Sequence, residues 1–243
     1  MPLVDLVASD REKVDDAVRR IVDACGDRLL GVALYGEAAS ADYHPARSPL
    51  SLVLLVREVS PATLGLLRPI AVRLRRRRIP TPLVVDADYL ERARDVFPLE
   101  LLELRNRHAP LSGDVSALAR IEIDSASLRR EIEAELRGKM LHLWEDYLTA
   151  RTLRRLGANV LESVPYFLHI LRGMLELNGA RATKDSIDVV AAVEQAYAVP
   201  LPMLGRLERL YRQGGRPART EVEAVFAACL AEARTLAGIL DRV

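Results

Sequence analysis

The feature that most constrains the fold of this chain is a change in hydrophobic pattern near residue 125. Before it, three short and nearly uninterrupted apolar runs occur at Leu29–Tyr35, Leu50–Val56 and Pro82–Val85. Continuous runs of this length are typical of strands buried on both faces of a sheet. Between the second and third runs, Pro61–Arg78 has its apolar residues at helical spacing. Strand, helix and strand in this order predict an α/β layer.

Other segments of the first half fit the same layer. Residues 11–25 have helical periodicity, with Asp10 as a candidate N-cap and Gly26 as a candidate C-terminal stop. Residues 99–105 fit a helix or a strand equally well, and His108–Gly113 reads as a last short segment before a loop.

The second half has helical periodicity only. A long amphipathic helix is expected from Ser127 to about Leu148, and glycines and prolines separate the later helices. The later helices are expected at Val160–Leu177, Lys184–Tyr197, Leu201–Tyr211 and Glu221–Leu240. This pattern predicts a helical bundle. We place the boundary between Ile123 and Ser127, which gives domains at residues 1–124 and 125–243.

Composition excludes several classes of function. Among 243 residues, 35 Lys and Arg face 34 Asp and Glu, so the net charge is +1. This balance argues against binding nucleic acid or an anionic membrane through bulk charge. The basic cluster at Arg73 and Arg75–Arg78 is better explained as the C-terminus of a helix, where cations are favoured. No signal peptide or transmembrane segment is recognisable, and Cys25 and Cys229 read as buried thiols, so we expect a cytoplasmic protein.

The segment from Gly31 to Val56 carries a resemblance to a known family. Leu34-Tyr35-Gly36 ends the first apolar run, and Ser48-Pro49-Leu50-Ser51 opens the second. This arrangement resembles the signature of the polymerase-beta-like nucleotidyltransferases, in which the first strand ends in Gly-Ser and Ser-Asp-x-Asp opens the next. The helical second half resembles the bundles of the aminoglycoside and minimal nucleotidyltransferases. The resemblance implies a small mixed sheet with flanking helices, followed by an all-α bundle.

The chemistry of the family signature is missing from this chain. Nucleotidyl transfer usually needs two divalent cations, and Mg²⁺ prefers carboxylate oxygens. Pro49 and Ser51 occupy the two Asp positions, and neither offers a charged ligand. Glu37 stands where the family has Ser, so an anion replaces a group that would meet phosphates. Gly36, Glu37 and Ser48 therefore read as a vestigial nucleotide-binding turn, and we expect no metal and no cofactor.

Other carboxylates could in principle rebuild a site. Glu37, Asp42 and Asp86 are the candidates, because Asp86 ends the third apolar run, where the family often carries its third acidic residue. An equally good explanation of Asp86 is that it caps a helix beginning near Tyr89.

Three functional hypotheses follow. The leading one is a catalytically impaired nucleotidyltransferase-like protein that binds a small molecule or a protein. The alternative is an active nucleotidyltransferase that uses atypical carboxylates, and only this hypothesis requires Mg²⁺ and a nucleotide. The third is a structural partner, such as a homodimer or a toxin–antitoxin-like pair. We expect neither nucleic acid nor membrane as a partner.

Overall fold

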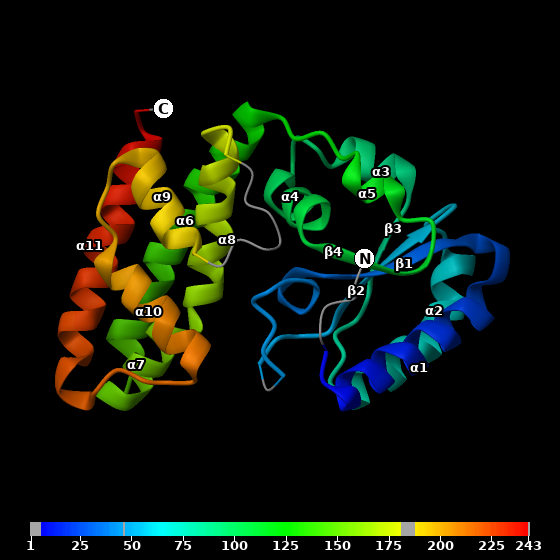
Figure 1. Cartoon of the computed structure of the whole chain (residues 1–243), viewed down its shortest axis with the longest axis horizontal. Helices are drawn as coiled ribbons and strands as arrows, with labels where there is room; N and C mark the ends of the chain where they lie inside the picture. Colours follow the sequence, from blue (N-terminus) through cyan, green and yellow to red (C-terminus); the bar gives the residue numbers. More distant parts are fainter. Residues whose placement is uncertain (1–5, 46, 181–187, 243) are drawn as a thin grey trace. The chain divides into compact units, whose positions relative to one another are not determined.

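The computed structural model describes residues 6–45, 47–180 and 188–242. These residues form two compact units, the first from the residues up to Asp124 and the second from those beginning at Ser125. Figure 1 shows a sheet with helices in the first unit and helices alone in the second. Each unit is described by itself.

The sheet of the first unit has four strands in the order β3-β2-β1-β4. β1 is antiparallel to both β2 and β4, whereas β2 and β3 are parallel. The strands are β1 (Leu29–Tyr35), β2 (Ser51–Val56), β3 (Leu83–Val85) and β4 (His108–Gly113). This small mixed sheet with flanking helices confirms the fold class that the sequence predicts.

The continuous apolar runs are explained by burial of the sheet on both faces. Along β1, Val32 and Leu34 join the core beneath α1 and α2, and Ala33 joins a second core beneath α3, α4 and α5 (Figure 1). Because strand side chains alternate, both faces need apolar residues. The helices are α1 (Ala8–Cys25), α2 (Pro61–Arg76), α3 (Ala87–Arg92), α4 (Pro98–Asn106) and α5 (Ser116–Ala119), with 3₁₀ turns η1 (Gly26–Arg28) and η2 (Gly36–Ala39).

Local details confirm some predictions and correct one. Gly26 ends α1 with φ of 49°, and residues 99–105 are helical within α4. Asp10 is not an N-cap, because α1 begins two residues earlier at Ala8. Its buried carboxylate instead accepts a hydrogen bond of 2.7 Å from the Tyr43 hydroxyl. The basic cluster does lie at the end of a helix, and Arg77 Nη1 is 2.7 Å from Asp16 Oδ2.

The second unit contains helices α6 to α11 and confirms the predicted bundle. Its elements are α6 (Ser125–Thr149), α7 (Leu153–Glu162), α8 (Val164–Leu177), α9 (Val189–Tyr197), α10 (Pro202–Gln213), η3 (Arg219–Glu221) and α11 (Val222–Leu240). The single helix predicted at Val160–Leu177 is two helices that meet at Ser163, because Pro165 is accommodated only in the first turn of a helix. Residues 184–187 of the predicted Lys184–Tyr197 helix lie outside the described residues.

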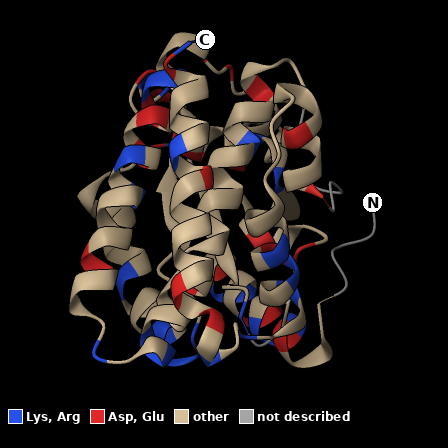
Figure 2. Cartoon of the chain, turned by 90° about the vertical axis from the view of Figure 1, so that its left-hand side faces the viewer, with Lys and Arg blue, Asp and Glu red and all other residues tan. Residues whose placement is uncertain are grey.

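The bundle core follows the periodicity of α6. Leu128, Ile132, Leu136 and Leu143 are buried on the side of α6 that contacts α8 and α11. Charged residues of both signs are interspersed over the bundle helices in view (Figure 2). Both cysteines are buried and free, as predicted. No helix among the described residues combines the length and the apolar character that crossing a bilayer requires.

Candidate functional site

The candidate site lies at the edge of the sheet where β1 ends and where β2 and β4 begin. Tyr35 at the end of β1 pairs with Ser51 on one side and with His108 on the other. The chain between Tyr35 and Ser51 forms a long connection, residues 36–50, which we call the Glu37 loop. It begins at Gly36, whose φ of 75° is accessible to glycine. The Gly36 N–H donates to the Arg107 carbonyl at 2.9 Å, so this amide is already used within the protein.

Glu37 and Ser48 meet across the Glu37 loop. The Ser48 hydroxyl donates to Glu37 Oε2 at 2.8 Å and accepts a hydrogen bond of 2.9 Å from the His44 amide. Ser48 is only 7% exposed. The structure thus places Gly36, Glu37 and Ser48, the residues predicted to form a vestigial nucleotide-binding turn, in one loop. The Ser48 hydroxyl and the Gly36 amide are both hydrogen-bonded within the protein.

Pro49 and Ser51 do not continue one regular strand. The Ser51 amide donates to the Pro49 carbonyl at 2.9 Å, which closes a tight turn, and β2 begins only at Ser51. Alternation of side chains along a strand therefore does not extend back to Pro49, which is exposed. Ser51 is partly buried and hydrogen-bonds the Tyr35 side chain. Burial and the nearby charge of Glu103 raise the pKa of Tyr35, and this bond from Ser51 opposes them.

The buried side chain of Arg107 forms an ion pair with Asp42, the other acidic residue of the Glu37 loop. Arg107 is 3% exposed, and its Nη2 lies 2.7 Å from Asp42 Oδ2 while its Nη1 lies 2.7 Å from Glu103 Oε1. Nη2 also donates to the Ser40 hydroxyl. Sequence reasoning missed Arg107 and Glu103, because no motif contains them. The only usable signal is that Arg107 directly precedes the strand that pairs with the end of β1.

Asp86 lies at the other end of the sheet. β3 runs parallel to β2, with Leu55 opposite Val85, so Asp86 follows the end of β2 that is remote from Ser51. Val56 follows Ser51 by five residue steps along the strand, which corresponds to about 16 Å. The structure therefore keeps Glu37 and Asp42 in one loop and does not bring Asp86 to them.

Asp86 acts as a helix cap where it lies. Its Oδ1 accepts a hydrogen bond from the Tyr89 amide and its Oδ2 one from the Val59 amide, each of 2.8 Å. These two backbone donors lower the pKa of the Asp86 carboxyl. In the part of the chain that the structure describes, no three His, Cys, Asp or Glu residues are grouped so that they could hold a metal ion.

Comparison with known proteins identifies the fold. No model of a protein family matches the sequence, and no curated protein matches it. The solved structure of spectinomycin adenyltransferase AAD(9) from Enterococcus faecialis, with ATP and spectinomycin, aligns over 95% of this chain and 99% of that chain at 14% identity and a TM-score of 0.56. A mutant of the toxin–antitoxin complex MntA-HpeT matches over 54% of this chain and 98% of that chain, at 13% identity and a TM-score of 0.32. The likeness to the adenyltransferase and the mixed sheet followed by helices show that the chain has a nucleotidyltransferase-like fold.

Proposed function

We propose that this chain is a catalytically impaired nucleotidyltransferase-fold protein that acts by binding a small molecule or another protein. One observation carries the proposal. At the start of β2, where the family signature has two aspartates, Pro49 is exposed in a turn and the Ser51 hydroxyl bonds Tyr35. Neither residue supplies the anionic oxygen that Mg²⁺ requires.

The charges around this edge of the sheet support the same conclusion. Arg107 forms buried ion pairs with both Asp42 and Glu103, so each of these carboxylates already has a cationic partner from the protein. Glu37 is bound by Ser48 and presents a negative charge next to the turn. A triphosphate at this turn would be repelled by Glu37 and would find the Gly36 amide already bonded.

Calorimetry with nucleotide tests the proposal directly. Titrating the protein with ATP in the presence and absence of Mg²⁺ is expected to give no saturable heat that depends on the metal. Saturable, metal-dependent binding by the unmodified protein would support an active nucleotidyltransferase with atypical carboxylates and would contradict our proposal.

A double substitution restores the missing charges. Pro49→Asp together with Ser51→Asp is expected to create saturable Mg²⁺ binding, because two carboxylates are then available at the start of β2. The matched control introduces two aspartates at exposed alanines of the bundle, Ala134→Asp and Ala231→Asp, and is expected to bind no Mg²⁺. Equal binding by both variants would show that added negative charge alone, and not its position, attracts the metal.

The class of bound partner has its own measurement. Size-exclusion chromatography with light scattering distinguishes a protein partner from a small-molecule ligand. A protein partner or a second copy of the chain raises the measured mass above that of one chain. A small-molecule ligand leaves the measured mass at that of one chain.

A further inference from the structure

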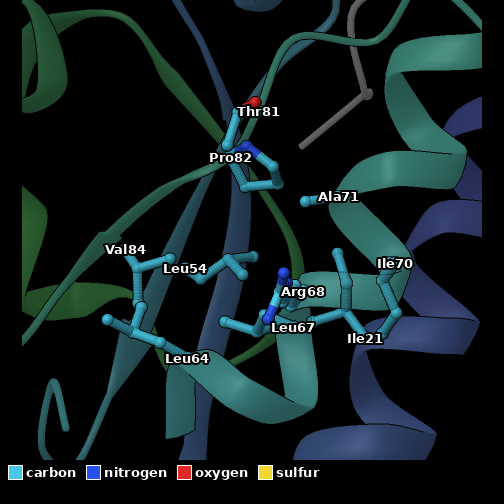
Figure 3. Close-up of a pocket in the computed structure, with 10 residues that line it drawn as sticks. All are labelled: Ile21, Leu54, Leu64, Leu67, Arg68, Ile70, Ala71, Thr81, Pro82 and Val84. Atoms are coloured by element: carbon cyan, nitrogen blue, oxygen red, sulfur yellow. The ribbon is translucent and has the colours of Figure 1, made fainter. Parts of the chain in front are cut away.

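The first unit contains a second candidate binding site, a pocket on the sheet face covered by α1 and α2. It lies between α2 and the paired strands β2 and β3 and has a volume of about 360 Å³. Figure 3 shows Leu54 and Val84 of the strands and Leu67 of α2 among the side chains around it. Pockets that bind small ligands typically begin at about 300 Å³, so this space is large enough for one.

The pocket is separate from the Glu37 loop. Its lining residues come from α1, α2, β2, β3 and the residues just before β3, and none of them belongs to the Glu37 loop, residues 36–50. An inference about this pocket therefore does not depend on the proposed function.

The lining is apolar apart from two residues. Arg68 is its one charged residue and Thr81 supplies a hydroxyl (Figure 3). Arg68 projects from α2, is exposed, and has no carboxylate partner among the residues that the structure describes. Leu64, which also lines the pocket, is 44% exposed. Apolar surface left in contact with water beside an unmatched cation suits a ligand with an apolar body and one negative charge.

The volume sets the size of the apolar body. A volume of about 360 Å³ lies near the lower end of the range of small-ligand pockets, so it suits a small apolar body. We propose that this pocket binds a small amphipathic monoanion, such as a medium-chain carboxylate, with its chain against Leu64, Ala71 and Val84 and its head group at Arg68.

Calorimetry with decanoate and 1-decanol tests this pairing of chain and charge. The wild-type protein is expected to bind decanoate saturably and about fivefold more tightly than the alcohol, the upper range for an exposed ion pair. Shortening the carboxylate by one methylene is expected to weaken binding about fourfold. Equal affinity for acid and alcohol, or no saturable binding of decanoate, would overturn the proposal.

Substitutions locate the ligand. Arg68→Gln is expected to weaken decanoate binding about fivefold and to leave 1-decanol unchanged. The matched control is Arg76→Gln, which removes the same charge from an exposed position of the same helix outside the pocket and is expected to change neither affinity. If both arginine variants weaken decanoate binding equally, the binding is explained by general attraction to a basic helix and not by the pocket.

A second pair of variants tests the apolar part of the pocket. Ala71→Phe fills the pocket and is expected to abolish binding of both ligands. If that variant fails to fold, Leu64→Ser provides the test. Replacing an exposed leucine costs little stability, and the loss of its apolar contact is still expected to weaken the binding of both ligands. Unchanged binding by a folded variant of either kind would place the ligand elsewhere.

Discussion

Arg107 is the residue on which the arrangement of the Glu37 loop depends most. Its buried guanidinium is shared by Asp42 of the loop and Glu103 of α4. Arg107→Met keeps much of the side-chain volume but leaves two carboxylates facing each other without that cation. We expect the free energy of unfolding to fall by about 3–5 kcal/mol, the usual cost of breaking a buried ion pair.

Chemical denaturation measures this loss. Arg75→Met is the control, because Arg75 is exposed on α2, and it is expected to change stability by less than about 0.5 kcal/mol. Similar midpoints for the two variants would show that the Arg107 network does not hold the loop.

The hydrogen bond between Tyr43 and Asp10 joins the same loop to α1 and makes its stability depend on pH. Burial raises the pKa of Asp10, but hydrogen bonds from Lys13 and Tyr43 outweigh it, so the net pKa lies below 3.8. Burial and Asp10 raise the pKa of Tyr43 to about 12. The contribution of Asp10 is therefore present above pH 3.8 and is lost as the pH falls through its lowered pKa. That of Tyr43 is present below pH 10 and is lost as the pH rises through about 12.

Tyr43→Phe removes this bond. We expect it to lower the free energy of unfolding by about 1.5–3 kcal/mol near neutral pH, because the acceptor is charged. The difference from wild type is expected to shrink in acid, where Asp10 is protonated. Denaturation at a series of pH values checks this, and a difference that does not change between pH 3 and pH 7 would contradict it.

For single residues, the sequence predicts departures from a local motif better than it predicts contacts between distant residues. The proposed replacement of two family aspartates by Pro49 and Ser51 could be inferred because the motif and the strand are adjacent in the sequence. The pairing of Arg107 with Asp42 joins residues 65 positions apart. No local pattern encodes such a contact, which depends on β4 pairing with β1.

Among the elements, periodicity predicts those whose burial is regular. The strands follow the apolar runs, and the buried positions of α1 and α6 repeat at helical spacing. Residues 99–105 stayed ambiguous because α4 is buried at Leu99, Leu101, Leu102 and Leu104, which leaves almost no polar face to mark its period. The sequence does not specify the relative direction of β2 and β3. It therefore does not predict that Asp86 and Ser51 lie at opposite ends of the sheet.

The cap of α3 gives a prediction at the scale of elements. Asp86→Ala removes acceptors for the Tyr89 and Val59 amides and is expected to cost about 1–2 kcal/mol. Asp86→Asn is the matched control, because asparagine caps helices nearly as well, and it is expected to cost less. The lowered pKa of Asp86 means that its contribution is lost as the pH falls, so wild type and Asp86→Asn should converge in acid. Unchanged stability of Asp86→Ala would contradict this role as a helix cap.

For the whole molecule, charge balance decides between kinds of partner. Binding to nucleic acid depends on neutralising phosphates with an excess of Lys and Arg on one surface. This chain has a net charge of +1, and the bundle carries both signs interspersed (Figure 2). The positive charge of its densest basic cluster is partly neutralised, since Arg77 forms an ion pair with Asp16. We therefore expect no electrostatic surface for a polynucleotide among the described residues.

Fluorescence anisotropy with labelled duplex DNA and single-stranded RNA tests this conclusion. At physiological salt we expect no dissociation constant tighter than about 100 µM, the weak end of non-specific binding. Replacing Arg73, Arg75 and Arg76 with glutamine is expected to make no difference, because the cluster is explained by its position at the C-terminal end of α2. Micromolar binding that weakens steeply with salt, and that these three substitutions abolish, would assign the cluster to phosphate contacts. The slope of the logarithm of the binding constant against the logarithm of the salt concentration, about −0.9 per phosphate contact, would count those contacts. Such a result would identify a polynucleotide, instead of a small molecule or a protein, as the partner of this chain.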